Sequence, residues 1–482
     1  MRLIPLFLLP FLFLFVGQTL AETPRYLTIE GRIICEGKGV ADVPVSDGFS
    51  VVSTDKNGNY SITTTSLHSH IFYSLPSGFE SPVVNGVPEF YAPIDPRKKK
   101  QTIHFSIQKS TGSQQKHAVV VWADPQVLEE NEFELLRDVV KDVKHTIDSV
   151  AGLKPVYAIS CGDNVFDRLN FFDNYKKEIA VTGIPFYHVP GNHDLDYNHR
   201  SNDYSAKSYS NHFGPAYYSF NKGDIHYIVL KNVFYYGFSH RYIGYIDETQ
   251  LNWLEQDLAR VKPGSTVMVS LHIPTVYGDS EKPSDFASEM SNSVMNRKAL
   301  FEILKPFKVH LLAGHSHTQW NTLISDKMME HTHAAASAAW WQGEVCIDGS
   351  PKGYTVYEAD GDKLTWYFKG VGLSKDEQFK LYPVNADSSN PECFIANVYN
   401  FDPQWKVEWL EDGKAAGAME QYWGVDPLAK ELYQPGKNKK FGWLSAGSTH
   451  HIFRAKPKNL EAKITVVVTD RFGNVYKKNL TN

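Results

Sequence analysis

Five short polar motifs hold the residues of this sequence that are best suited to chemistry. Each follows a run of apolar residues, which is where a site on a sheet is usually presented. Alone, each motif is weak evidence, because Gly-Asn is common in turns and a single His-Asp pair is often a surface hydrogen bond. Together and in order they indicate one composite site. The motifs are Asp124-Pro125-Gln126, Gly162-Asp163, Gly191-Asn192-His193-Asp194, His272 and Gly314-His315-Ser316-His317.

The side chains in these motifs suit a pair of divalent metal ions. Carboxylate and amide oxygens and imidazole nitrogens are hard and borderline ligands. Two ions ~4 Å apart can hold a phosphoryl group for in-line attack by a hydroxide that bridges them. Asp124 and Asp163 bring two negative charges and the hydroxide a third. Two divalent ions therefore keep one excess positive charge, which favours an anionic ester as substrate.

The elements that must position these motifs are strands and helices in alternation. Continuous apolar runs predict buried strands at residues 118–122, 156–160, 184–188, 225–230, 266–271 and 309–313. Apolar residues at helical spacing predict helices at 133–147, 251–258 and 300–304. The sequence therefore predicts an α/β region with its polar motifs at the carboxyl ends of strands.

In their order and separations the motifs resemble those of the calcineurin-like metallophosphoesterases, over residues 116–341. The resemblance implies a sandwich of two mixed β-sheets flanked by helices. It implies that one metal ion is held by Asp124, Gln126, Asp163 and His317, and the other by Asp163, Asn192, His272 and His315. It also implies that His193 is the general acid at the leaving-group oxygen and that Asp194 orients it.

Two residues depart from the family's usual pattern. Gln126 stands where most members have His, although a subset carries Gln. An amide oxygen is a harder and weaker ligand than imidazole, so we expect a looser first metal and manganese, iron or magnesium in preference to zinc, with manganese or iron favoured. A carboxylate appears one residue later than usual, as Asp167, and we expect it to support the site rather than bind metal.

The first 21 residues predict an export signal. One Arg precedes a long apolar run, and small residues lead up to Ala21. The run is short for a membrane span, and the sequence has no other long apolar stretch. We therefore expect a soluble mature chain without an integral membrane segment, in the periplasm or secreted.

Two β-rich regions flank the α/β region. Short alternating strands and Gly, Asn and Asp turns mark residues 22–112, where residues 37–60 resemble the transthyretin-like, carboxypeptidase-regulatory β-sandwich. β character returns at residues 348–482, which leaves 113–347 for the metallophosphoesterase domain. This arrangement resembles a three-part group of exported bacterial calcineurin-like phosphoesterases. We expect the flanking domains to contact a glycan or a protein.

Charge and cysteine content narrow the function classes. A formal net charge of -5 argues against nucleic acid as a partner. The four cysteines, Cys35, Cys161, Cys346 and Cys393, show no paired spacing, so neither a disulfide framework nor a zinc knuckle is indicated. The sequence leaves open whether Cys346 and Cys393 form a disulfide bridge.

The sequence thus predicts an exported hydrolase that cleaves a small phosphate ester with two divalent ions, a bridging hydroxide and His193 as acid. The residues do not separate a monoester from a diester, or from a pyrophosphate of a lipid-linked or nucleotide substrate. An alternative from another class is an exported binding protein with a vestigial metal core. The complete set of ligands argues against it, because loss of catalysis should first erode His193 or a metal ligand.

Overall fold

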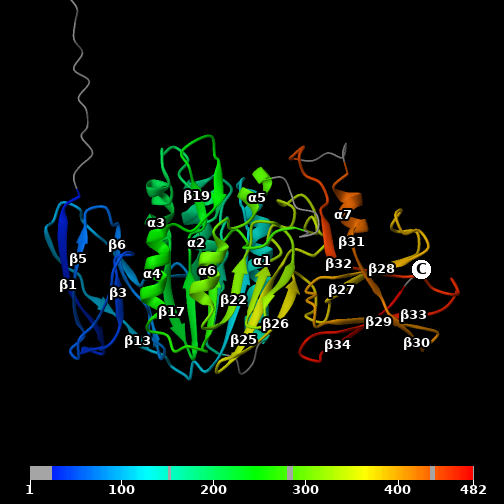
Figure 1. Cartoon of the computed structure of the whole chain (residues 1–482), viewed down its shortest axis with the longest axis horizontal. Coiled ribbons are helices and arrows are strands. Elements are labelled where there is room, and N and C mark those ends of the chain that lie inside the picture. The colour runs from blue at the N-terminus through cyan, green and yellow to red at the C-terminus, as the bar shows by residue number, and fades with distance from the viewer. Residues whose placement is uncertain (1–23, 150–153, 279–285, 435–439, 481–482) are drawn as a thin grey trace, which may run out of the picture.

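The chain forms three parts that lie in a row along its longest axis: an N-terminal β domain, a central α/β core and a C-terminal β domain (Figure 1). This computed structural model describes residues 24–149, 154–278, 286–434 and 440–480. The expected export signal, residues 1–21, lies outside them. Across the described ranges, none of the helices has the length and apolar character needed to cross a bilayer.

The first core sheet has five strands in the order β16-β15-β14-β25-β26. β14, β15 and β16 run parallel, so their carboxyl ends meet at one edge. β25 and β26 are antiparallel additions. The strands are β14 Lys116–Trp122, β15 Val156–Ser160, β16 Phe186–His188, β25 Gly353–Asp360 and β26 Lys363–Gly370.

The second core sheet has six strands in the order β17-β18-β21-β22-β24-β23. β18, β21, β22 and β24 run parallel, and the two edge strands pair antiparallel with their neighbours. The strands are β17 Tyr218–Lys222, β18 Ile225–Val229, β21 Thr266–Ser270, β22 Lys308–Ala313, β23 Trp320–Ser325 and β24 Met328–Thr332. The expected sandwich of two mixed sheets is confirmed.

The pattern of burial explains the continuous apolar run of β14. Val119 and Val121 face the cluster between the sheets, whereas Val120 and Trp122 face the helices outside the first sheet. Helix α1 lies on that outer face, and α4 and α6 pack on the second sheet. The helices are α1 Glu132–Ser149, α2 Phe172–Ala180, α3 Lys207–Phe213, α4 Glu248–Leu258, α5 Phe286–Asn292, α6 Arg297–Leu304 and α7 Pro427–Leu432.

The core extends further along the chain than the sequence indicated. We expected the C-terminal domain to begin at residue 348, but β25 pairs with β14 from Lys116↔Asp360 to Val121↔Thr355. Tyr354 and Val356 are buried in the same cluster as α1. Without β25, the edge of the first sheet at β14 would be unpaired. β25 can cover this edge because it carries apolar residues on both of its faces, as a strand inside the core must.

The N-terminal domain is built around β1, which pairs with β2, β5, β11 and β12 and buries alternate residues. A second sheet has the order β10-β6-β3-β4. The domain continues into the core, because Leu75 bridges to Phe220 and one hydrophobic cluster runs through both. Its strands are β1 Tyr26–Cys35, β2 Lys38–Gly39, β3 Pro44–Ser46, β4 Val51–Ser53, β5 Asn59–Thr65, β6 His70–Tyr73, β7 Phe79–Glu80, β8 Val83–Val84, β9 Val87–Pro88, β10 Tyr91–Pro93, β11 Lys100–Thr102, β12 Phe105–Ser106 and β13 Gln108–Lys109.

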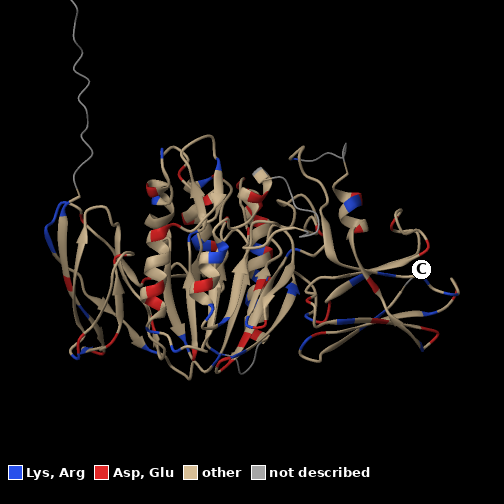
Figure 2. Ribbon diagram, viewed as in Figure 1, with Lys and Arg blue, Asp and Glu red and all other residues tan. Residues whose placement is uncertain are grey.

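The C-terminal domain packs two four-stranded sheets, β27-β28-β32-β31 and β30-β29-β33-β34. All four cysteines are free, so the bridge between Cys346 and Cys393 does not form. Acidic and basic residues are interspersed over the described parts of all three domains (Figure 2). The strands are β27 Phe379–Tyr382, β28 Phe394–Val398, β29 Lys406–Glu411, β30 Lys414–Ala418, β31 Glu420–Val425, β32 Ser448–Ala455, β33 Ile464–Thr469 and β34 Val475–Asn479.

Candidate metal centre

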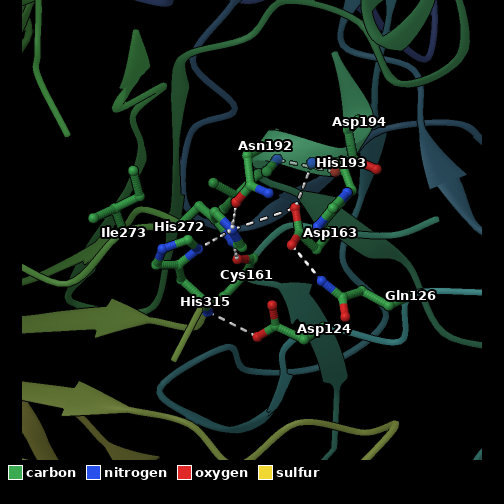
Figure 3. Close-up of polar contacts among 12 residues, drawn as sticks. Asp124, Gln126, Cys161, Asp163, Asn192, His193, Asp194, His272, Ile273 and His315 are labelled. Atoms are coloured by element: carbon green, nitrogen blue, oxygen red, sulfur yellow. Dashed lines mark hydrogen bonds and ion pairs between the residues drawn. The ribbon is translucent and has the colours of Figure 1, made fainter. Parts of the chain in front are cut away.

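The parallel strands of both sheets bring the five motifs to one place. Three motifs follow β14, β15 and β16 of the first sheet, and two follow β21 and β22 of the second. Figure 3 shows Asp163 with interactions to Gln126, His193 and His272. The seven expected ligands thus form one continuous cluster, although their strands belong to different sheets.

The first group of donor atoms comes from Asp124, Gln126 and His317, which are all buried. His317 Nε2 lies 3.8 Å from Asp124 Oδ1. Asp124 Oδ1, Gln126 Oε1 and His317 Nε2 have no hydrogen-bond partner within the described residues. Buried polar atoms are almost always satisfied, so three unsatisfied acceptors on neighbouring motifs call for a cation. Their chemistry fits a divalent metal ion.

The second group comes from Asp163, Asn192, His272 and His315. His272 Nε2 lies 3.0 Å from Asn192 Oδ1, 3.2 Å from His315 Nδ1 and 3.3 Å from Asp163 Oδ1. The donor atoms of Asp163, His272 and His315 all lie within 4.8 Å of one another. Two nitrogens and two oxygens that converge in this way fit a second divalent ion.

Asp163 belongs to both groups. Its Oδ2 accepts a hydrogen bond of 2.5 Å from Gln126 Nε2, on the side of the first group. Its Oδ1 faces His272 and accepts a bond of 2.8 Å from the backbone N–H of His193. Asp163 therefore contacts residues of both groups, and its role as a bridging ligand stays a prediction.

Backbone carbonyls fix the ring orientation of two histidine ligands. His272 Nδ1 donates to Cys161 O at 2.8 Å, and His317 Nδ1 donates to Ala338 O at 2.6 Å. A proton held on Nδ1 leaves Nε2 as the basic nitrogen, directed into the site. The side chain of Asn232 adds support, because its oxygen accepts the N–H groups of His272 and Ile273, both at 3.1 Å.

Most of these ligands sit in strained backbone. Asp124, Gln126, Asp163, His315 and His317 have φ values of 53°, 40°, 53°, 71° and 51°. The left-handed region costs a residue with a Cβ about 1 kcal/mol. Such strain concentrates at functional sites, where the surrounding structure holds it. Here it bends the chain sharply as each strand ends, which turns the side chain toward the metal centre.

Two glycines of the motifs are required by close approach. A Cβ on Gly191 would lie 2.1 Å from Asp163 Oδ1, and one on Gly162 would lie 2.5 Å from His272 Nδ1. Gly162 also has a φ of 93°. Gly191 therefore lets the loop after β16 approach Asp163, and Gly162 lets the ring of His272 approach the loop after β15.

The buried carboxylates and imidazoles perturb one another. Burial, reinforced by the charge of Asp163, raises the pKa of Asp124 to about 8. Burial alone would lower the pKa of His272, but Asp163 and Asp124 outweigh it and raise the pKa to about 9. The acidic side chains thus demand positive charge in a dry site, which is the charge that a divalent ion supplies.

His193 lies at the edge of this cluster, with 22% of its side chain exposed. Its Nδ1 donates to Asp167 Oδ1 at 3.0 Å, and its ring stacks on Phe166 at a centroid distance of 3.9 Å. We expected Asp194 to orient this ring, and that expectation is wrong: Asp167 does so. Asp167, expected as a supporting residue, contacts the general-acid candidate directly.

Asp194 holds the loop instead. The loop begins the 3-10 turn η2, Asn192–Asp194, and folds the Asp194 side chain back into the interior. Its carboxylate accepts from Gly191 N at 2.9 Å, from Asn164 N at 3.2 Å and Nδ2 at 2.9 Å, and from Val165 N at 3.3 Å. Four donors from two loops leave it no contact with the His193 ring.

Sequence reasoning missed several residues around the centre. Phe166, Asn164 and Asn232 lie outside the five motifs, and only their neighbours in space reveal their contacts. Trp340 also lies beside the centre, where it stacks on His317 at a centroid distance of 3.8 Å.

Comparisons with known proteins cover nearly the whole chain. Three profiles of one family match: "N terminal of Calcineurin-like phosphoesterase" at residues 27–110, "Calcineurin-like phosphoesterase" at 117–319, and "C terminal of Calcineurin-like phosphoesterase" at 330–476. A curated relative, "Probable glycerophosphodiester phosphodiesterase" of Arcobacter nitrofigilis, is 26% identical over 192 residues. The match covers 38% of this chain and 66% of the relative, slightly less than two thirds of its length.

Solved structures similar to this chain include two phosphatases. A dimetal phosphatase from Danio rerio has a TM-score of 0.37 and 14% identity, over 53% of this chain and 96% of that chain. A purple acid phosphatase from yellow lupin seeds has a TM-score of 0.41 and 13% identity, over 69% of this chain and 67% of that chain.

Proposed function

The chain belongs to the calcineurin-like phosphoesterase family, a class of hydrolases, and from this we propose that it hydrolyses a phosphate ester with two divalent metal ions. One observation carries the proposal: the unsatisfied buried atoms of Asp124, Gln126 and His317 lie beside the converging donor atoms of Asp163, His272 and His315. A bound cation would satisfy the donor atoms of both sets.

The first ion would be held by Asp124, Gln126, Asp163 and His317, and the second by Asp163, Asn192, His272 and His315. When bound, the two ions supply Lewis acidity toward the phosphoryl group and a water molecule acidic enough to give a nucleophile near neutral pH. Strained backbone and fixed ring orientations would hold the side chains of these residues in place around the ions and limit their movement during the reaction.

His193 is the proposed general acid. Asp167 accepts a hydrogen bond from Nδ1, so Nε2 is the nitrogen that donates to the leaving-group oxygen. Stacking on Phe166 keeps the ring from turning away. The backbone N–H of His193 also bonds to Asp163, which ties the position of the acid to that of the metal ligands.

Gln126 sets the proposed metal preference. Its amide oxygen is a weaker and harder ligand than the imidazole usual in the family, so the first ion is held less tightly. Manganese or iron therefore suits this site better than zinc.

A second candidate is hydrolysis of a diester at the same residues. The observation in its favour is the curated relative, which carries the name of a phosphodiesterase. Proton donation by His193 serves both reactions, so substrate preference separates them.

The test measures the rate at which purified protein, stripped of metal and reloaded with manganese, hydrolyses four esters. These are p-nitrophenyl phosphate, bis-p-nitrophenyl phosphate, phenyl phosphate and diphenyl phosphate. We expect metal-dependent turnover of p-nitrophenyl phosphate or bis-p-nitrophenyl phosphate, and the preferred ester distinguishes monoesterase from diesterase. His193→Ala should slow hydrolysis of the corresponding phenyl or diphenyl ester by about 10²–10⁴-fold. It should slow the p-nitrophenyl esters less, because their leaving group needs little protonation. Failure of the protein to bind two ions per chain would refute the proposal and favour a binding protein.

We also propose that the enzyme acts outside the cytoplasm. The apolar amino-terminal run that ends in small residues at Ala21 supports export. Mass spectrometry of protein recovered from the periplasm and the medium should show a chain that begins at Glu22. An intact amino terminus in the cytoplasmic fraction alone would contradict export.

A further inference from the structure

Six aromatic rings form a continuous arc beside the metal centre, from the proposed acid to a metal ligand. Neighbouring ring centroids along the arc are 3.9, 5.6, 5.1, 4.6 and 3.8 Å apart. Four of the five contacts are stacked within 22° of parallel, and the fourth contact in the series is edge-on at 87°. This ring arc consists of His193, Phe166, Phe441, Trp443, Trp340 and His317.

Two rings of the arc come from the C-terminal domain. Phe441 and Trp443 lie on the segment that leads into β32, far in sequence from the metal-binding loops. Lys440 anchors this segment to the core, because its Nζ lies 2.7 Å from Glu132 Oε1 and 3.1 Å from Glu129 Oε1. The C-terminal domain thus completes a surface that begins at the metal centre.

The exposure of the arc suits a ligand. Trp443 is 58% exposed although it contacts two other arc rings, so a large part of its indole is open to solvent. Lys440, the cation closest to it in sequence, is held by two carboxylates. Its Nζ also lies 5.8 Å from the centroid of the Phe441 ring. The arc therefore presents apolar, planar surface beside one cation that is already paired.

We propose that the ring arc binds the leaving group of the substrate and selects an alcohol that carries a planar aromatic ring, of the aryl or nucleoside class. This inference rests on the proposed function. His193 must contact the leaving-group oxygen, and Phe166 is the ring that stacks on the imidazole of His193. The rest of the leaving group then extends past Phe441 to Trp443, whose exposed indole can stack with a planar ring.

An acyclic polyol gains less from such a surface. Its hydroxyl groups need hydrogen-bond partners, and aromatic faces provide few of them. A planar ring instead buries apolar area against the faces of the arc and keeps its polar edge in water. The arc therefore discriminates between leaving groups by shape and polarity.

Phosphonates test this inference without turnover, because their carbon–phosphorus bond is not cleaved. Calorimetric titration of the manganese-loaded full chain should show phenylphosphonate binding about tenfold more tightly than methylphosphonate, at the lower end for stacking on an aromatic side chain. Trp443→Ala should remove most of this preference, and Trp443→Phe should retain most of it. Thermal melts of each variant check folding.

Trp423→Ala is the matched control. Trp423 is also an exposed tryptophan of the C-terminal domain, but its ring contacts Trp320 and His450 rather than the arc. The preference for the phenyl compound should survive this change. Equal affinity of the two phosphonates in the unmodified protein, or equal losses in the two alanine variants, would overturn the inference. If neither phosphonate binds the metal-loaded chain, the phosphate site is absent and the proposed function falls as well.

Discussion

The two acidic residues near His193 have separable roles, and exchanging each for its amide distinguishes them. Asp167→Asn keeps an oxygen that can accept from His193 Nδ1 but removes the charge that stabilises the ring in its donating form. Because the Asp167 side chain is 32% exposed, solvent screens much of this charge. We expect a loss of about 1.4 kcal/mol in the transition state, or about tenfold in kcat, with unchanged stability.

Asp194→Asn should instead weaken the fold. The Asp194 carboxylate accepts from four N–H groups, and in either amide orientation an NH₂ would face at least one of them. Burial raises the pKa of Asp194 to about 6, so the hydrogen bonds of this side chain matter more to the fold than its charge. One opposed buried donor pair costs about 2–3 kcal/mol, which should lower the Tm by about 5 °C.

The assay combines kcat for phenyl phosphate with a thermal melt, on manganese-loaded protein. Phenol has a pKa of about 10, so its departure depends on proton donation by His193. We expect a slow but stable Asp167→Asn variant and a less stable Asp194→Asn variant whose folded fraction keeps most of its kcat. The opposite pair of results, with Asp194→Asn stable and slow and Asp167→Asn fully active, would restore Asp194 as the orienting residue.

Two further predictions concern the metal site and acid stability. Gln126→His should tighten binding of the first metal ion and shift its preference toward zinc, because imidazole is the better ligand for zinc. Competitive titration with zinc and manganese checks this, and unchanged affinities for both ions would refute it. Burial lowers the pKa of His117, His310 and His333 to about 4 each, below the unfolded value of about 6.5. The unfolded chain therefore binds more protons between these values, and stability should fall as pH drops from about 6.5 toward 4; a Tm that stays constant or rises over this window contradicts the assignment.

The core strands and the candidate metal ligands can be predicted from the sequence for the same physical reason. Strands buried on both faces, such as β14 and β15, must be continuous apolar runs, and their polar ends then stand out. Parallel pairing places Asp124 and Asp163 at one sheet edge without further information. His272 and His315 follow the parallel strands of the other sheet in the same way.

What the sequence left undetermined depends on contacts between distant segments. Asp167 and Asp194 are both close to His193 in sequence, and only the fold of the η2 turn decides which carboxylate reaches the ring. β25 looks like any apolar strand, and its place in the core depends on the open edge of β14. Phe441 carries no motif, and its stacking on Phe166 requires the C-terminal domain to dock.

The strained backbone of the metal centre also suggests why this core is flanked by further domains. Five ligands in left-handed conformation each cost about 1 kcal/mol, a sum comparable to the net stability of a small domain. The packing around the site must offset this cost. The largest hydrophobic cluster runs from Leu27 in the N-terminal domain through β18 and β21 to Met329, so burial in one domain supports the strands that end at the site. The metal centre therefore depends on residues far from it, and a change at the N-terminal interface, such as Phe72 against Trp253, acts on the same cooperative unit.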